Sequence, residues 1–155
     1  MPSPSAKQVV PAGVATVTTG RDHTLFTKTD GSLWGMGRNN YGQLGDGKSG
    51  GAFEGYDEGI DKKTPIKIRD ANVTKVSAGY QHSLFLMEDG SLWGMGLNDK
   101  GQLGDGSNTN SVTPKLIIEK EVTAVVAGKN HRGGGHSLFV KKDGTLWSMG
   151  ENSYG

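Results

Sequence analysis

Four histidines are the side chains best suited to chemistry in this chain of 155 residues, and their spacing keeps them apart. Histidine acts as a general base or a metal ligand near neutral pH, but both roles need partners close by. His23 and His82 each lie three residues after a glycine, in two copies of one sequence pattern. One histidine per copy makes neither a catalytic pair nor a metal cluster. We therefore expect a structural role, in which a ring nitrogen binds the backbone of a neighbouring loop or strand.

The other two histidines, His131 and His136, lie five residues apart in a glycine-rich segment. Such a pair is able to bind a transition metal weakly. The favoured interpretation is that five extra residues (RGGGH) repeat the histidine, and that only one of the two, here assigned to His136, fills the position seen in the other copies. We expect no metal and no cofactor.

Residues 42–49 (GQLGDGKS) match the pattern of a phosphate-binding loop. In such a loop, backbone amides at the start of a helix hold the phosphates. The next residues, GGAFEGYDEG, contain too much glycine to continue a helix. The second copy, GQLGDGSN, also lacks the lysine. A nucleotide site is therefore disfavoured.

The acidic residues that follow this pattern do not have the spacing of a calcium loop. Glu54, Asp57, Glu58 and Asp61 are expected in a solvated or partner-binding loop. The chain has no cysteine, so it offers neither a disulfide nor a thiolate nucleophile. Residues that recur once per copy are better explained by folding than by one active centre. We expect no catalytic residue and no enzymatic activity.

The chain contains three copies of one unit, which begin near Val17, Val76 and Val126. Their tryptophans, Trp34, Trp93 and Trp147, are 59 and 54 residues apart. These spacings are longer than the underlying period because the first and third copies carry insertions. We expect the insertions to form loops, since added length costs little there.

Each copy has the pattern of about four β-strands. In the second copy the apolar, β-prone runs are 73–78, 82–88, 91–96 and 113–118. The middle two runs flank Asp89-Gly90, a hairpin signal in which both turn residues are expected to have φ > 0. The same glycine recurs as Gly31 and Gly144. Four strands in a unit of this length predict an all-β fold of propeller blades, each a four-stranded antiparallel sheet. The tryptophans are expected in the core between adjacent sheets.

The repeats divide the chain into an N-terminal extension at 1–13 and tandem propeller repeats at 14–155. The approximate units are 14–72, 73–122 and 123–155, the last one truncated. A closed propeller needs at least about four blades. We therefore expect about three repeats of an incomplete propeller, which is a fragment or completes its ring with other copies.

Two segments, VSAGYQHSLFL (76–86) and SLWGMG followed by N and GQLGDG, resemble the regulator of chromosome condensation repeat family. The resemblance covers roughly residues 14–155. It implies a seven-bladed propeller in the complete protein and a habit of binding proteins. Known members include a nucleotide exchange factor for a small GTPase, a β-lactamase inhibitor and interaction modules. The near-identity of the copies is similar to that in bacterial surface and secreted proteins, so we expect a secreted or cell-surface bacterial protein.

The expected function is a non-enzymatic protein–protein interaction module that binds a protein of unknown identity. A net charge of +1 gives no reason to expect nucleic acid, and no apolar run is long enough to span a membrane. The binding loops are expected at 48–64, 107–112 and 129–136, where the copies differ. Their candidate residues are Phe53, Glu54, Tyr56, Asp57, Glu58, Asn108, Asn110, Lys129, Asn130 and Arg132. The alternatives are an exchange-factor-like module for a small GTPase and a fragment that assembles with copies of itself.

Overall fold

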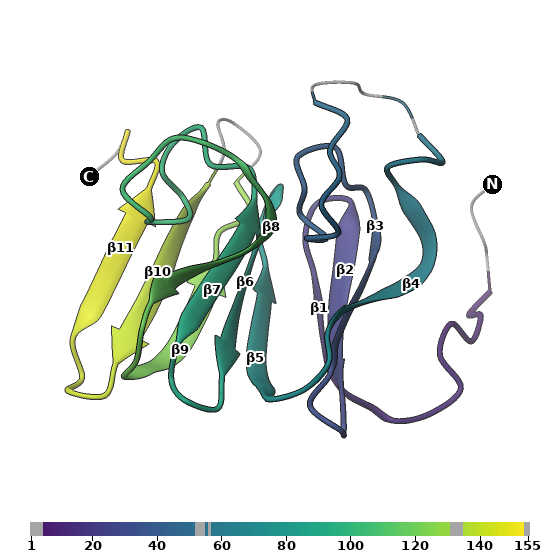
Figure 1. Cartoon of the computed structure of the whole chain (residues 1–155), viewed down its shortest axis with the longest axis horizontal. Helices are drawn as coiled ribbons and strands as arrows, with labels where there is room; N and C mark the ends of the chain where they lie inside the picture. Colours follow the sequence, from purple (N-terminus) through teal and green to yellow (C-terminus); the bar gives the residue numbers. More distant parts are fainter. Residues whose placement is uncertain (1–4, 52–54, 56, 131–134, 154–155) are drawn as a thin grey trace.

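Three antiparallel β-sheets stand side by side in the computed structural model (Figure 1). The structure describes residues 5–51, 55, 57–130 and 135–153. The first sheet has the order β1 (Val14–Thr19), β2 (His23–Lys28), β3 (Leu33–Gly37) and β4 (Lys62–Arg69). The second has β5 (Val73–Ala78), β6 (His82–Met87), β7 (Leu92–Gly96) and β8 (Ser111–Ile118). The third has β9 (Val122–Ala127), β10 (His136–Lys141) and β11 (Leu146–Gly150).

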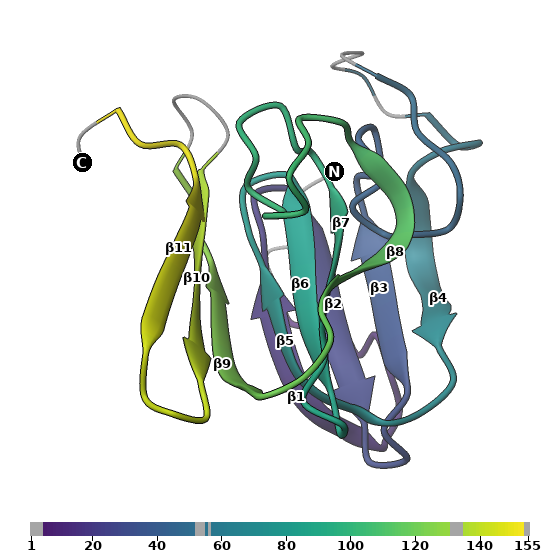
Figure 2. The same ribbon diagram turned by 60° about the vertical axis from the view of Figure 1, so that its left-hand side comes forward.

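These sheets confirm the predicted all-β fold. The four strands of the second sheet differ from the predicted runs by no more than two residues at either end. Within each sheet, strands that are adjacent in sequence pair with one another, as in a propeller blade, and all of these pairings are antiparallel. Figure 2 shows that neighbouring sheets face one another and are inclined to each other.

The turn between β6 and β7 differs in one detail from the prediction. Gly90 has a φ of 79°, but Asp89 is not among the described residues with positive φ. Met87 accepts a hydrogen bond from the Gly90 amide at 3.0 Å and donates one to the Ser91 carbonyl at 3.0 Å. This is a three-residue hairpin that ends in a glycine bulge, so only the glycine needs the left-handed conformation. Gly31 and Gly144 occupy the same place in their hairpins, with φ of 78° and 85°.

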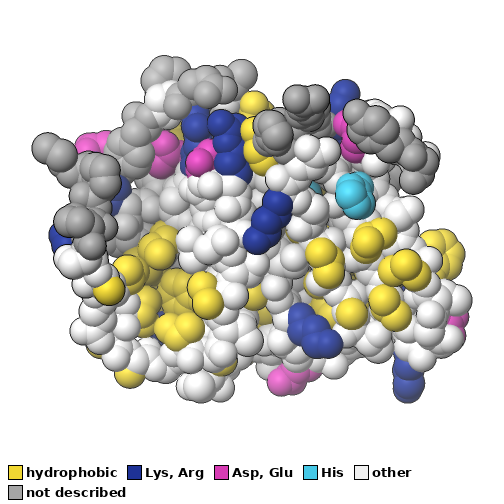
Figure 3. Space-filling view, turned by 180° about the vertical axis from the view of Figure 1, so that it is seen from behind, with side chains coloured by type: hydrophobic (Ala, Val, Ile, Leu, Met, Phe, Trp, Pro, Cys, Tyr) yellow, Lys and Arg dark blue, Asp and Glu magenta, His cyan; other side chains and the backbone are white. Residues whose placement is uncertain are grey.

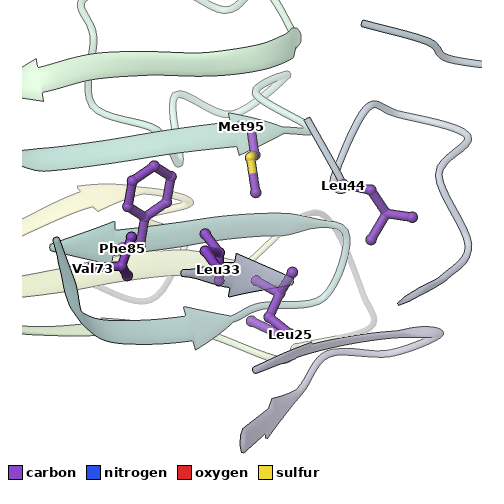
Figure 4. Packing of buried hydrophobic residues seen from close by; sticks show 7 residues of the cluster. Leu25, Leu33, Leu44, Val73, Phe85 and Met95 are labelled. Atoms are coloured by element: carbon purple, nitrogen blue, oxygen red, sulfur yellow. The ribbon is translucent and has the colours of Figure 1, made fainter. Parts of the chain in front are cut away.

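Two apolar cores fill the spaces between the sheets. The first joins Leu25, Leu33 and Leu44 of the first repeat with Val73, Ala78, Phe85 and Met95 of the second (Figure 4). The second core joins Leu84, Leu86, Leu92 and Leu103 of the second repeat with Val122, Ala127 and Phe139 of the third. Leucines from one sheet thus meet aromatic and smaller side chains from the next, and this face-to-face burial holds the sheets together.

Short connections at one end of the sheets lead from each blade into the next. Asn72 and Glu121 precede β5 and β9, and both have positive φ, 67° and 68°. Their carbonyls accept hydrogen bonds from the amides of Glu88 and Lys142, at 2.8 and 2.7 Å. Gly13 precedes β1 with a φ of 81°, and its carbonyl accepts from the Thr29 amide at 2.9 Å. Residue 13 therefore has the geometry of a connection between blades.

Candidate functional site

The repeat histidines join neighbouring sheets. His23 Nε2 lies 3.0 Å from Ser83 Oγ, and His82 Nε2 lies 2.8 Å from Ser137 Oγ. Each serine hydroxyl donates its single proton to a glutamine carbonyl of the preceding repeat, Gln43 at 2.7 Å or Gln102 at 2.8 Å. The serine must therefore accept, so the imidazole carries its proton on Nε2. The ring nitrogen thus binds a side-chain hydroxyl of the neighbouring sheet, and for His23 the backbone of His82, which the sequence analysis expected as the kind of partner, also interacts with the ring.

Burial keeps these two rings neutral. His23 is 3% exposed and His82 is fully buried, and neither Nδ1 atom has a hydrogen-bond partner among the described residues. Removal from water lowers the pKa of His23 to about 4 and that of His82 to about 3, because a charged ring is disfavoured in an apolar interior. Neutral, separated rings of this kind hold the sheets in register and do not exchange protons near neutral pH.

His136 occupies the repeat position in the third sheet. It pairs with Gly150 in the β10–β11 ladder, as His23 pairs with Gly37 and His82 with Gly96. It is exposed, because the described residues form no further sheet that covers it. His131 lies outside the described residues. Among the residues that the structure does describe, no group of three or more acidic or histidine side chains is placed to hold a metal ion.

The repeat tryptophans are only partly covered: Trp93 packs against the first core, as expected, but none of the three rings is fully buried. Trp34 and Trp93 are half-buried, and Trp147 is 48% exposed. Each ring stacks on a phenylalanine of the adjacent strand, with centroids 6.0 to 6.4 Å apart. Cations lie over these rings, since Lys28 Nζ is 4.1 Å from the Trp34 centroid and the Arg69 guanidinium of the first sheet is 4.7 Å from that of Trp93.

A short polar chain anchors each tryptophan to its hairpin turn. In the second sheet, Trp93 Nε1 donates to Ser91 Oγ at 2.9 Å, and Ser91 donates its hydroxyl and its amide to Asp89. The serine hydroxyl and then its amide lower the pKa of Asp89, and the same holds for Asp30 in the first sheet. These aspartates are therefore structural, and the recurring Asp-Gly-Ser-Leu-Trp sequence is the signal that identifies them.

The long loop between β3 and β4 contains the first set of predicted binding residues. Phe53, Glu54 and Tyr56 lie outside the described residues, whereas Asp57 and Glu58 are exposed. Asp61 is 5% exposed, and its two carboxylate oxygens accept hydrogen bonds from the amides of Asn39 and Asp57, at 2.8 and 3.0 Å. Asp61 therefore anchors this loop instead of lying in solvent as expected.

Residues 42–49, which match the phosphate-loop pattern, have a different architecture from such a loop. No helix follows them within the described part of the loop. Leu44 is fully buried in the first core, and its amide donates to Asn39 Oδ1 at 2.8 Å. The Asn39 amide group in turn donates to Asp46 at 2.6 Å. The side chain of Leu44 in this segment thus packs into the core between two sheets, and several of its backbone amides bind within the protein.

The loop between β7 and β8 has the same framework on a shorter scale. Asn98 donates through its side chain to Asp105 at 3.0 Å, and its backbone amide donates to Asn110 Oδ1 at 2.8 Å. Asn110 therefore takes the role that Asp61 has in the first repeat. Burial works to raise the pKa of Asp105, but hydrogen bonds from Lys115, Ser107 and Asn98 outweigh it and hold the pKa well below its usual range. Asn108 is exposed, with one bond to the Asp99 carbonyl.

The third predicted loop lies between β9 and β10. Lys129 and Asn130 are exposed, and Arg132 lies outside the described residues. This loop and the two described above project from the same end of the sheets, opposite the hairpin turns (Figure 1). The sheets therefore gather at one end the segments in which the three copies differ, although their sequence positions are far apart.

We call the hydrogen-bonded contact between a repeat histidine, the serine of the next repeat and a backbone carbonyl the joint between repeats. The sequence analysis missed the residues that complete it. The hydroxyls of Ser83 and Ser137, together with the backbone carbonyls of Gln43 and Gln102, share a hydrogen-bonded chain with the histidines, as described above. The signal for them was present, because His-Ser-Leu and Gly-Gln-Leu-Gly recur at fixed places in the copies. It could not show that the two motifs meet across sheets.

The sheets and their joints define the protein as part of a β-propeller built from tandem repeats. Models of the "Regulator of chromosome condensation (RCC1) repeat" match residues 14–43, 73–102 and 122–155, and also 30–86 and 89–132. The chain belongs to the regulator of chromosome condensation repeat family.

Known proteins that resemble the chain are much longer. It is 32% identical over 138 residues to Protein RCC2 homolog of Danio rerio, which covers 86% of this chain and 25% of that protein. It is 33% identical over 139 residues to E3 ubiquitin-protein ligase HERC2 of Homo sapiens, with 86% of this chain and 3% of that protein covered. The chain thus spans a quarter or less of the length of these two relatives.

Solved structures share the fold. Human WBSCR16 matches with a TM-score of 0.73 and 28% identity, covering 91% of this chain and 34% of that one. Yeast RCC1 (Prp20), solved with Kap60, matches with a TM-score of 0.69 and 23% identity, covering 89% and 32%. A structure of Prp20p from Saccharomyces cerevisiae is described with its binding properties to Gsp1p and histones. None of the described residues forms a helix long and apolar enough to cross a membrane.

Proposed function

We propose that this chain is a non-enzymatic part of a propeller that binds another protein through the loops at one end of its sheets. The observation that carries the proposal is the contrast between the two parts of each repeat. The joints between sheets are built from the same His-Ser-Gln chain, whereas the loops 38–61, 97–110 and 128–135 differ in length and sequence. Variable loops on a rigid scaffold are a common form of binding surface.

The exposed side chains of these loops carry both charges and amides. The exposed residues include Asp57 and Glu58 in the first loop, Asp99, Lys100 and Asn108 in the second, and Lys129 and Asn130 in the third. A mixed surface of this kind does not concentrate one sign of charge, so it fits a folded protein with a polar surface better than a polyanion. The binding of Kap60 by a propeller of the same fold supports a protein partner in general terms.

Shortening the first loop tests the proposal. Residues 49–60 are replaced by Asn-Thr, the residues at 108 and 109 in the second repeat, so that Asp61 takes the place of Asn110 and still anchors the loop. Immobilised wild-type chain and this variant are used to capture proteins from a lysate of the source organism, and the captured proteins are quantified by mass spectrometry. We expect at least one protein to be captured by the wild type and lost with the variant.

A control variant changes charge at the opposite end of the sheets. Glu88→Lys and Lys142→Glu lie beside hairpin turns and are expected to leave the capture unchanged. Direct binding of the captured protein to both variants then gives the affinity change. The proposal fails if the loop variant binds with wild-type affinity, or if the control variant loses binding to the same extent. The exchange-factor alternative rests on the family resemblance alone, and measured release of nucleotide from small GTPases tests it separately.

A further inference from the structure

Residues 5–13 have the sequence register of a fourth strand but form no strand in this structure. Counting back from the first residues of β1, β5 and β9 aligns Gly13 with Asn72 and Glu121, which share its positive φ and its carbonyl hydrogen bond. Four residues earlier, Val9 aligns with Ile68 of β4 and Ile117 of β8. Val9 is 56% exposed, whereas those two isoleucines pack against the cores.

The third sheet has an open position where a fourth strand like residues 5–13 would pair. Its described part has three strands, and the outer edge of β11 faces no fourth strand. Unpaired strand edges offer backbone groups that readily bind another strand. In the second sheet, Leu92 pairs with Ile118 and Trp93 with Leu116. The same register would place Val10 opposite Leu146 and Gln8 opposite Trp147.

The sizes of the side chains at positions 148 and 9 fit a pairing of residues 5–13 with β11. In the first two sheets, a glycine follows the tryptophan, and a Cβ added to Gly35 or Gly94 would lie 2.9 or 2.6 Å from the Cδ1 atom of Ile68 or Ile117. The third sheet has Ser148 at this place, so an isoleucine opposite it would clash. Val9 lacks the Cδ1 atom. The Ser148 and Val9 pair therefore fits where glycine and isoleucine fit in the other sheets.

The uncovered faces of the third and first sheets also carry the two partners of the contact between sheets, a histidine on one and a hydroxyl on the other. The third sheet exposes His136 together with Val126 and Leu146, which are 59% and 66% exposed. The first sheet presents Thr24, the hydroxyl at the position of Ser83, together with Val17, which is 67% exposed. Figure 3 shows apolar side chains gathered on both of these sheets.

We propose that residues 5–13 complete the third sheet of a second copy of this chain as its fourth strand, so that copies associate head to tail. The first sheet of one copy then lies against the third sheet of the other, with Thr24 within reach of His136. This contact is heterologous, because different surfaces of the two copies meet. The copies are separate chains, so their association must offset the loss of translational and rotational freedom, and we therefore expect it to be weaker than the contacts within the chain. The proposal does not depend on the binding function of the loops.

The mass of the 155-residue chain in solution tests the association. Sedimentation equilibrium from about 1 µM to about 1 mM spans the range of weak contacts. We expect species heavier than the 16.4 kDa chain that increase with concentration. Val9→Glu should weaken association by about tenfold or more, because it places a charge in a buried strand position. Pro11→Glu is the matched control, since the aligned residues Asp70 and Glu119 are acidic and lie beyond the strand ends. A monomer at every concentration overturns the proposal, as does equal weakening by both variants.

A compensating pair of substitutions tests the register. Val9→Ile restores the Cδ1 atom opposite Ser148 and should weaken association by about tenfold, the effect of overpacking. Adding Ser148→Gly to Val9→Ile recreates the pair found in the first two sheets and should return the association to within about twofold of wild type. Both positions are exposed in the single chain, and circular dichroism verifies that each variant folds. Association that ignores Val9→Ile, or that Ser148→Gly does not restore, contradicts the proposed strand pairing.

Discussion

The two buried histidines should make the protein unstable in mildly acidic solution. His23 and His82 have pKa values of about 4 and about 3 in the folded chain, below the value of 6.5 expected when the chain is unfolded. The unfolded chain therefore binds more protons between these values, and the stability falls as the pH falls below 6.5. At pH 5 each histidine lies 1.5 pH units below its unfolded pKa, which corresponds to about 2 kcal/mol each and about 4 kcal/mol together.

This loss is a large fraction of the total stability of a domain, which is typically about 5–15 kcal/mol. Urea unfolding monitored by tryptophan fluorescence, at pH 7.5 and pH 5.0, measures it directly. Asp30, Asp89 and Asp143 contribute little in this window, because the reference pKa of aspartate is 3.8 and the shifts of these three residues are downward. The stability that these aspartates provide is lost only at lower pH.

Replacement of one ring assigns the effect. In His82→Gln, the new amide is able to donate to Ser137 Oγ but has no group that titrates in this range, so about half of the pH dependence should disappear. His136→Gln is the matched control, because it removes a repeat histidine whose ring is exposed. Equal free energies of unfolding at the two pH values would refute the reasoning, and so would full pH dependence in His82→Gln.

Three other substitutions test local features of the fold by the same unfolding measurement. Glu121→Gly should stabilise the chain by about 1 kcal/mol, because a glutamate at a φ of 68° is strained and glycine is not; a loss of stability would contradict this. Ser91→Ala should cost about 1–3 kcal/mol, since it removes the hydroxyl that links Trp93 to Asp89, and an unchanged midpoint would show that the chain of bonds is dispensable. Gly94→Ala should lower the free energy of unfolding by more than about 1 kcal/mol through overpacking, because the added Cβ would lie 2.6 Å from Ile117 Cδ1. An unchanged free energy of unfolding would show that the core rearranges to accept the methyl group.

Much of the fold could be predicted from the sequence, because its signals are local and repeated three times. Alternating apolar residues and the turn glycines locate β6, β7 and the hairpin between them from a few adjacent positions. The internal repeat then fixes the number of sheets. These features depend on contacts between residues that are close in sequence, so one sequence is enough to find them.

The contacts between sheets were harder to predict. Ser83 binds His23 from 60 residues away, and nothing near the histidine shows that its partner is a hydroxyl. Asp61 looked like one acid among several in a solvated loop, but its place opposite the Asn39 amide makes it a buried anchor. The partial exposure of Trp147 was also hidden, because it depends on whether another sheet covers the ring.

The joint between sheets has a consequence for how such arrays change in length. His82 and Ser83 are adjacent in β6, yet His82 binds the following repeat and Ser83 binds the preceding one. Each unit thus carries both halves of the joint. A gene segment that is duplicated in tandem yields a blade that already fits its parent on both sides, without a new mutation at the junction. Replacing the joint with a different chemistry would instead require matched substitutions in successive units, so the array is freer to change its number of blades than the way the blades are connected.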